Sequence, residues 1–431
     1  MIREKVQIKT KEYGAVLFDS RCHAIKQKDI LQTGYRVFDD GKIGLKYIEG
    51  NADDEAMFRQ AEERLSLGIP YRHQPERDLI KSVDHTEDLP PFDRKDFVAR
   101  IEDVVEELSR ILPDFNISNG IYVTEKEYLL SNDQGLDLRF RDRYYTIDLG
   151  LNDRNSINII DGSLCFRSRQ FTPEFLLDYS RKVFANRGRT VRIEEGKKYP
   201  VIVCNGDFNN LYNGFINTCF EKELNAKNIA EGGSIFAGKI GEKLFNEKFN
   251  FTQFRTKEDS IGLPFFDSEG VIVEGGRVDF IKDGVLKQPY TDKELSKKYE
   301  FPLTGSAEVV PKSIPGLVKT GYEGIPLIKP DGSRVTGELE KLSDLIAGDR
   351  AIFVGFSLGG AYDSLGGYSM PIQKGFVYEN GELIGTAQEL MANTSVTEMY
   401  GKDYRGLAEN ELMPGVGQDF MVIDMRLDAN E

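Results

Sequence analysis

The chain has 431 residues, of which 40% are hydrophobic and 29% are charged, and its formal net charge is −15. A chain of this length and composition folds into about two or three domains, so a disordered protein is excluded. An acidic surface repels phosphate backbones and anionic lipids, so direct partners of those two kinds, nucleic acid and membrane, are not expected.

The chain shows no feature of a secreted or membrane-spanning protein. Its first residues, MIREKVQIKT, lack the apolar stretch of a secretory signal, and no run of about 18 apolar residues follows. The four cysteines form no Cys-x-x-Cys pair: Cys22, Cys165, Cys204 and Cys219. We therefore expect a cytoplasmic protein with reduced thiols.

The first predicted elements are two strands and a helix. Residues 34–50 alternate in polarity around Asp40-Gly41, which predicts a strand pair joined by a tight turn. Residues 51–68 predict a helix, with acidic residues early and Gly68 at its end. Residues 69–95 are mixed and polar, and we expect a connecting loop there.

Residues 96–112 predict the clearest helix of the chain, ended by Pro113. Its apolar residues recur at helical spacing and form one stripe: Phe97, Ile101, Val104, Val105, Leu108, Ile111 and Leu112. A stripe of this width is typical of a helix that packs against a core.

A block of strands follows this helix. Three stretches predict it: 121–135, which breaks at Asn132 to Gly135; 136–151; and 156–171, which is interrupted at Asp161-Gly162. Thr172 is then expected to cap a helix with Pro173 in its first turn and Gly188 after its end.

The exposed stretch 185–198 is the predicted boundary between an N-terminal α+β domain, residues 1–190, and a C-terminal β-rich peptidase-like domain, residues 191–431. Beyond it, 199–206 predicts a buried strand and 209–224 a helix. Asp283-Gly284 and Asn380-Gly381 predict two tight hairpins among Gly-rich loops. The fold class is therefore α+β, with helices concentrated in the first half.

Two motifs suggest chemistry but lack necessary parts. Gly355-Phe-Ser357-Leu-Gly359 fits a nucleophile elbow, yet the three histidines all precede residue 86, whereas that mechanism needs a histidine after the serine. Residues 233–240 fit a phosphate-binding loop except that Ile240 replaces the hydroxyl residue that holds Mg²⁺. We expect a strand that enters a flexible Gly-rich loop at the first place and a turn beside a short amphipathic helix at the second.

Asp267 and Glu269 lie two residues apart, so on a strand they would share one face and could act as an acid and base pair. Asp-Ser-Glu-Gly is also typical of a turn whose side chains bind their own backbone. The turn is the favoured interpretation, and the paired carboxylates remain an alternative.

Five segments in order resemble the TldD/PmbA family, whose members are named as modulators of DNA gyrase and as maturation peptidases. The segments are 33–57, TGYRVFDDGKIGLKYIEGNADDEAM; 128–140, YLLSNDQGLDLRF; 263–290, LPFFDSEGVIVEGGRVDFIKDGVLKQPY; 301–309, FPLTGSAEV; and 366–385, GGYSMPIQKGFVYENGELIG. The resemblance spans nearly the whole chain.

The family has a TldD-like branch with a zinc motif, H-E-x-x-x-H, and a TldE/PmbA-like branch without it. In this chain the matching place is 210–220, NLYNGFINTCF, where Asn213, Gly214 and Thr218 stand instead of the two histidines and the glutamate. The resemblance therefore implies the branch that carries no metal and no other cofactor. The segment 366–385 also lacks the Asp and Arg of the family's G-D-Y-S-R-G.

The resemblance implies a subunit that binds or gates unfolded peptide for proteolysis, as a homodimer or with a TldD-like zinc subunit. The candidate residues of the peptide cleft are Asp267, Ser268, Glu269, Gly270, Thr304, Gly305, Tyr368 and Ser369. Two alternatives stay open: an independent hydrolase using Ser357 or Asp267 with Glu269, and a regulatory protein that binds DNA gyrase.

Overall fold

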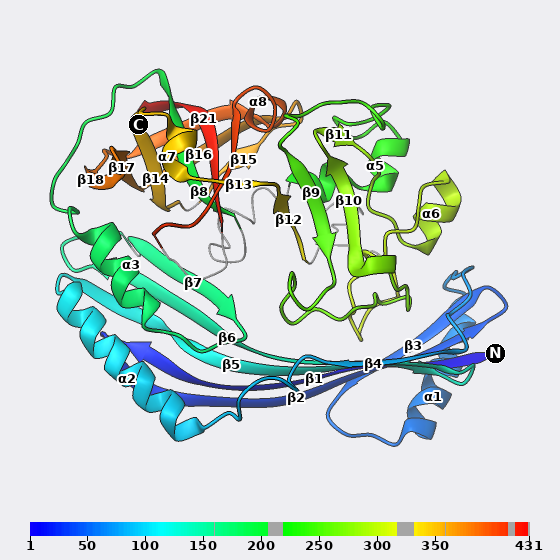
Figure 1. Ribbon diagram of the computed structural model, residues 1–431. Coiled ribbons are helices and arrows are strands. Elements are labelled where there is room, and N and C mark those ends of the chain that lie inside the picture. Colours follow the sequence, from blue (N-terminus) through cyan, green and yellow to red (C-terminus); the bar gives the residue numbers. More distant parts are fainter. Residues whose placement is uncertain (159, 206–218, 317–331, 358, 413–418, 430–431) are drawn as a thin grey trace.

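The structure is a computed structural model (Figure 1). It describes residues 1–158, 160–205, 219–316, 332–357, 359–412 and 419–429. A long curved sheet forms one side of the molecule, and two further sheets lie over it.

The long sheet has seven strands, all from the first 168 residues: β1 (Ile2–Phe18), β2 (Arg21–Asp39), β3 (Lys42–Glu49), β4 (Leu79–Asp84), β5 (Phe115–Asn132), β6 (Leu136–Asp153) and β7 (Gly162–Ser168). Their order is β3-β2-β1-β5-β6-β4, and β7 also pairs with β6. Neighbours are antiparallel except β4, which runs parallel to β6. The predicted loop 69–95 is therefore wrong in part, because it contains β4.

The buried face of the long sheet changes along its long strands, and β5 shows how. Near its start Ile117 and Ile121 are buried in the cluster that contains the helix 94–111. Near its end Tyr128 and Leu130 are buried against Phe265 of the second half of the chain. Odd and even residues point to opposite faces of a strand, so the sheet packs on one face at one end and on the other face at the other end.

Three helices accompany the long sheet: α1 (Asp54–Glu63), α2 (Arg94–Ile111) and α3 (Phe175–Phe184). The stripe predicted for α2 is confirmed, since five of its residues are buried in α2 and Leu112 is fully buried just after it. The predicted cap at Thr172 is wrong. A separate turn precedes α3, in which the Thr172 carbonyl accepts from the Phe175 N–H at 3.5 Å, so the helix begins three residues later.

The second half contains a four-stranded sheet in the order β11-β10-β9-β12 and a larger ten-stranded sheet. The first consists of β9 (Asn250–Phe254), β10 (Arg277–Lys282), β11 (Val285–Leu286) and β12 (Ser333–Thr336). The second consists of β8 (Lys197–Asn205), β13 (Leu339–Glu340), β14 (Ala351–Phe356), β15 (Ala361–Tyr362), β16 (Gly367–Ile372), β17 (Lys374–Glu379), β18 (Glu382–Thr386), β19 (Leu390–Ser395), β20 (Tyr404–Ala408) and β21 (Asp419–Ala429).

The helices of this half are short: α5 (Ala226–Ala230), α6 (Lys293–Tyr299), α7 (Leu342–Ile346) and α8 (Val396–Met399). Of the helix predicted over 209–224, residues 219–223 are helical and 206–218 lie outside the described residues. Both predicted hairpins are confirmed. Asp283 and Asn380 have φ of 52° and 53°, and the glycine that follows each is also positive, as two-residue hairpin turns require.

The α+β fold class is confirmed, since several sheets are accompanied by helices. Every strand of the long sheet precedes residue 190, but one apolar cluster joins α2 and α3 to Phe353 and Phe376 of the ten-stranded sheet. The division at residue 190 stays a prediction. Among the described residues, no helix has the length and apolar character needed to cross a membrane.

Candidate functional site

Asp267 begins a tight turn that is buried between the long sheet and the second half. Its carboxylate accepts hydrogen bonds from the Glu269 and Val271 N–H groups, both at 2.9 Å, and from the Ala307 N–H at 3.4 Å. Gly270 has a φ of 79°, and its N–H donates to the Asp267 carbonyl at 3.0 Å. The predicted turn is therefore present, and Asp267 shapes its backbone.

Glu269 projects from this turn into a polar, buried setting. Its Oε1 accepts a hydrogen bond from the Tyr71 hydroxyl at 3.0 Å, and its Oε2 accepts one from the Lys293 N–H at 2.8 Å. Burial and the nearby carboxylates of Asp267 and Asp292 raise the pKa of Glu269 to about 8. This carboxyl therefore exchanges its proton near neutral pH.

A buried ion pair of the long sheet holds the same turn. Arg36 of β2 donates from Nη1 to Glu4 Oε1 at 3.0 Å and to the Ser268 carbonyl at 2.8 Å. The Arg36 side chain is fully buried and that of Glu4 is 3% exposed. Burial raises the pKa of Glu4, and the guanidinium opposes that effect. Charges of the sheet thus fix the backbone position of the turn.

Thr304 and Gly305 lie beside this turn. The Thr304 hydroxyl donates to the Thr291 carbonyl at 3.2 Å, and Arg255 Nε donates to the Gly305 carbonyl at 3.1 Å. Gly305 has a φ of 58°, and a Cβ there would lie 2.8 Å from a Val273 methyl group. The structure therefore brings six of the predicted cleft residues together.

Tyr368 and Ser369, the other two predicted cleft residues, lie in β16 of the ten-stranded sheet. Tyr368 is 5% exposed and belongs to the apolar cluster of the second half. Ser369 is exposed, and its hydroxyl donates to Asn393 Oδ1 at 2.6 Å. Their part in a peptide cleft stays a prediction, as does that of the turn residues.

Asn213, Gly214 and Thr218 lie outside the described residues, but their chemistry can be compared with a zinc site. They supply an amide, no side chain and a hydroxyl, whereas structural and catalytic zinc sites use imidazole, thiolate and carboxylate. Burial raises the pKa of the adjacent Cys219 thiol. Among the described residues, no three His, Cys, Asp or Glu side chains gather as metal ligands. This donor set does not fit zinc.

The described residues of the two incomplete motifs lie at the end of a strand and in turns that follow α5. β14 ends at Phe356, Ser357 is 2% exposed, and a further strand, β15, begins at Ala361, where a nucleophile elbow would continue as a helix. In the residues 233–240, the Ser234 hydroxyl donates to the Glu223 carbonyl, and the Ile235 N–H donates to Glu223 Oε2. That N–H group is therefore not directed at a phosphate.

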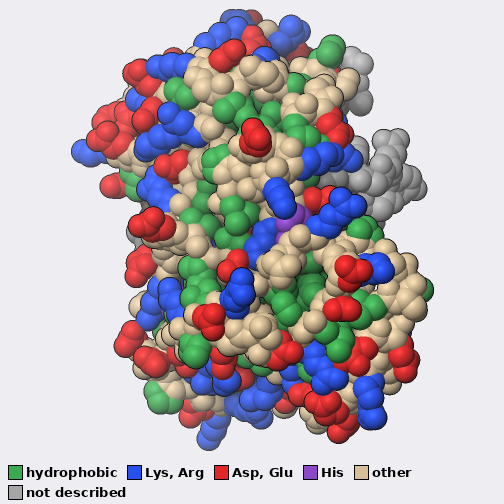
Figure 2. All heavy atoms as spheres, turned by 90° about the vertical axis from the view of Figure 1, so that its right-hand side faces the viewer, with side chains coloured by type: hydrophobic (Ala, Val, Ile, Leu, Met, Phe, Trp, Pro, Cys, Tyr) green, Lys and Arg blue, Asp and Glu red, His purple; other side chains and the backbone are tan. Residues whose placement is uncertain are grey.

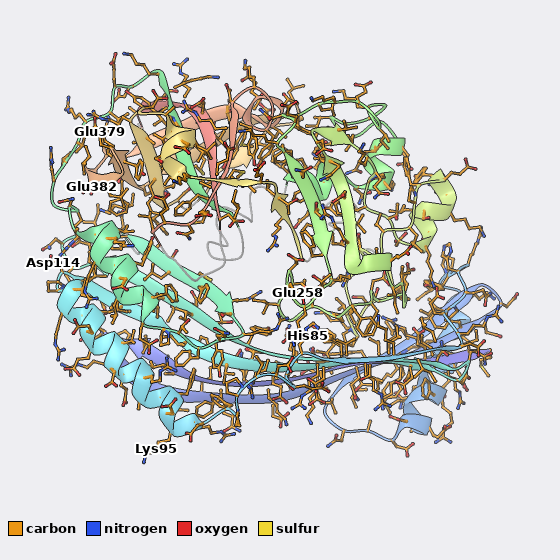
Figure 3. The ribbon with its side chains drawn as sticks, viewed as in Figure 1. His85, Lys95, Asp114, Glu258, Glu379 and Glu382 are labelled. Carbon is orange, nitrogen blue, oxygen red and sulfur yellow. The ribbon has the colours of Figure 1, made fainter. Side chains whose placement is uncertain are left out.

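A second buried charge cluster was missed from the sequence. Arg169 donates to both carboxylate oxygens of Asp142, at 2.8 and 2.7 Å, and from Nη2 to His85 Nδ1 at 3.1 Å. In Figure 3, His85 lies over the long sheet, below the loop that carries Glu258.

Asp142 keeps its charge in this cluster. Burial acts to raise its pKa, but the neighbouring His85 and the hydrogen bonds from Arg169 and the Gly262 N–H lower it to about 2. Arg169 also donates to the Ser260 carbonyl at 2.7 Å. The cluster therefore fastens the sheet to the loop 257–262. An acidic residue inside the alternating stretch 136–151 was the available signal for it.

Sequence comparison places the second half in a known family. The family model described as PmbA/TldA metallopeptidase C-terminal domain matches residues 196–418, just over half of the chain. An uncharacterized protein of Methanocaldococcus jannaschii is 22% identical over 83% of this chain and 82% of its own length. A zinc metalloprotease TldD homolog of Saccharolobus solfataricus is 25% identical over 42% of this chain and 40% of its own.

Solved structures share the whole fold. TldE from Thermococcus kodakarensis superposes with a TM-score of 0.76 at 15% identity, covering 99% of this chain and 97% of its own. A candidate modulator of a DNA gyrase from Thermotoga maritima gives 0.75 at 16% identity, covering 99% and 96%. Together with the family match, these findings confirm the resemblance: the chain belongs to the TldD/PmbA family of metallopeptidase-like proteins.

Proposed function

We propose that this chain is a TldE-like, metal-free member of its family that binds or gates unfolded peptide for cleavage by a zinc-bearing partner. The observation that carries the proposal is the donor set at 210–220, where Asn213, Gly214 and Thr218 replace the ligands and the base. Without imidazole and carboxylate at that place, zinc cannot be held there to activate water.

The histidines elsewhere support the same conclusion. The chain has three, His23, His73 and His85, and all belong to the first part of the chain. His23 lies on β2, and His85 follows β4 in the buried cluster with Arg169. Each is therefore far along the chain from the segment where relatives of the TldD type are expected to bind metal.

The turn at residues 267–270 fits a supporting role in this function. Asp267, Ser268 and Glu269 are at most 4% exposed, and their hydrogen bonds go to the protein itself. Groups buried in this way shape the walls of a site more readily than they touch an incoming peptide. We assign them to the framework of the peptide cleft.

Reconstitution tests this function. The chain is produced alone and together with a TldD-like zinc protein, and assembly is followed by size-exclusion chromatography with light scattering. We expect a complex whose cleavage of unfolded peptides exceeds that of the zinc subunit alone and is abolished by a chelator. The proposal would be contradicted if the zinc subunit did not bind this chain and if its rate of peptide cleavage were the same with and without this chain.

A regulatory function on DNA gyrase is the second candidate, because one structural neighbour is named as a modulator of that enzyme. Its partner would be the protein and not DNA. The formal net charge is −15, and Figure 2 shows acidic and basic side chains interspersed over the visible face of both halves. Recovery of gyrase and of no TldD-like chain in a pull-down would favour this function over the first.

A further inference from the structure

The strand β2 has a long open edge. It pairs with β1 from Arg21 to Phe38, with one irregularity at His23, but β3 pairs only with residues 32–39 of β2. Residues 21–31 therefore have a strand on one side and, among the described residues, none on the other. Ile25 is 46% exposed and Ile30 is 39% exposed.

The backbone groups that point outward from this edge can be identified. The Leu31 carbonyl accepts a hydrogen bond from the Gly50 N–H at 2.8 Å, so Leu31 points toward the side of β3. Successive residues of a strand alternate in this direction, and the pairing with β1 is regular here. Ile25, Gln27 and Asp29 thus present their N–H and C=O groups on the open edge, ready to pair with an added strand.

The side chains beside these groups differ between the two faces. Lys26 and Lys28 lie on one face and share a single carboxylate, Glu12, at 3.5 and 2.8 Å. On the other face a cavity of about 300 Å³ is lined by Gln27 and Asp29 with Phe92, among other residues. Lys11, Arg94 and Arg143 also line this cavity, together with Glu12 and Glu125. Both faces of the edge therefore carry cations, and the face with the cavity can receive a side chain.

A second copy of the same edge is disfavoured in three of the five registers centred on residues 25 to 29, although a pair centred on residue 25 or 29 sets no lysine opposite another. In an antiparallel self-pair centred on residue 26, 27 or 28, a lysine always faces a lysine directly, since 26 opposes 26 or 28, or 28 opposes itself. Like charges opposite each other destabilise a strand pair. The complementary occupant is an extended segment with carboxylates at every second residue.

We propose that the open edge of β2, residues 21–31, binds an extended acidic peptide as an added antiparallel strand. The proposal deepens the proposed function, on which it rests, by naming the class of peptide that this chain holds. Main-chain hydrogen bonds to Ile25, Gln27 and Asp29 would give affinity for many sequences, and Lys26 and Lys28 would select carboxylate side chains.

The test uses the full chain and a fluorescein-labelled peptide of about ten residues that alternates Glu and Val, a length that matches the open edge. Binding is measured by fluorescence anisotropy, with a peptide that carries Lys in place of Glu as the comparison. We expect the acidic peptide to bind at least about tenfold more tightly. Equal affinity for the two peptides, or no binding of either, would overturn the proposal and leave the lysines as a guard against edge pairing.

Two variants separate the backbone contribution from the charges. Gln27→Pro removes an outward N–H while leaving the ladder to β1 intact, and it should weaken binding at least about tenfold with little change in melting temperature. The double change Lys26→Glu with Lys28→Glu should reverse the preference to the Lys peptide. Lys95→Glu on α2 makes one such charge reversal outside the open edge; it is the control and should leave the preference unchanged.

The remaining outcomes are also decisive. Unaltered binding by both variants would overturn the proposal, and so would a dimer of this chain that dissociates on Gln27→Pro, since the edge would then be a contact between copies. Zinc content and cleavage by a partner do not enter these measurements. Failure of the edge to bind peptide is therefore distinguishable from failure of the proposed function.

Discussion

The long sheet is joined to the second half of the chain by different contacts at its two ends. At one end the ring centroid of Phe184 in α3 lies 5.6 Å from that of Phe115 and 5.5 Å from that of Phe376. At the other end Arg36, Glu4 and Glu269 make directed polar contacts with the turn and its surroundings. Figure 1 shows these ends near α3 and near β3.

The difference shows how one sheet can be stabilised by contacts that depend on pH at one end and by contacts that do not at the other. The free energy of apolar contacts depends on the buried area and on shape. The stability contributed by the end near α3 should therefore change little with pH. The end near β3 adds matched polar partners to the apolar cluster around Phe265, and it contains Glu269, whose pKa of about 8 makes its proton occupancy change near neutrality. Substitutions at each end should therefore differ in size and in pH dependence.

The largest effect is expected from Arg36→Met. It leaves the buried Glu4 carboxylate without its guanidinium, and loss of one partner of a buried pair costs about 3–5 kcal/mol. The loss of stability is measured by unfolding the variant and the wild type in urea. The double variant Glu4→Gln with Arg36→Met should recover part of the loss, because it buries no unpaired charge. A single variant as stable as the wild type would show that the pair does not hold this end.

Phe184→Ala should lower the free energy of unfolding by about 3 kcal/mol. This is the lower part of the range for such a truncation, since Phe184 is 6% exposed. The loss should be the same at about pH 5 and about pH 8, because the ring contacts carry no charge. Unfolding curves at both values check this. A loss that changes clearly with pH would remove the contrast between the two ends.

Asp142→Asn should destabilise the protein by about 1.5–3 kcal/mol at neutral pH, because Arg169 loses a charged acceptor. The pKa of Asp142 is lowered from 3.8 to about 2. The stability that its charge contributes is therefore fully present above about pH 4 and is lost as the pH falls toward 2. Asp137→Asn, at an exposed pair with Arg139, is the control and should cost less than about 1 kcal/mol. Equal losses in the two variants would contradict the role given to the cluster.

Glu269→Gln should change the pH dependence of stability more than stability itself. The folded pKa is raised from 4.5 to about 8, so the folded state holds an extra proton in this range and stability declines as pH rises, by at most about 1.4 kcal/mol per pH unit. The variant should flatten that decline. Glu382→Gln, at an exposed position of β18, should leave the slope unchanged. An unaltered slope in Glu269→Gln would show that this carboxyl is not the group that titrates.

Local patterns predicted the parts of the fold that local physics decides. The apolar stripe of α2 and the turns at Asp40-Gly41, Asp283-Gly284 and Asn380-Gly381 lie where the sequence indicates. β4 was missed because none of its six residues is buried and Ile80 is 80% exposed, so no buried apolar face marks it and pairing with β6 decides its structure.

The candidate site was predictable only in part. The turn at Asp267 follows from its own residues and was expected. The partners of Glu269 were not, because Tyr71 lies 198 residues away in the sequence and the contact depends on the packing of both halves. Buried charge clusters of this kind leave no periodic pattern, and the cluster of His85, Asp142 and Arg169 was missed for the same reason.

The metal content of the isolated chain tests the proposed function most directly. The chain is purified without chelators, its zinc is measured by mass spectrometry, and cleavage of unfolded peptides is assayed on the same sample. We expect far less than one zinc per chain and no cleavage above the buffer rate, because the side chains at 210–220 supply no zinc ligand set. One tightly held zinc per chain, together with cleavage that a chelator removes, would contradict the proposal.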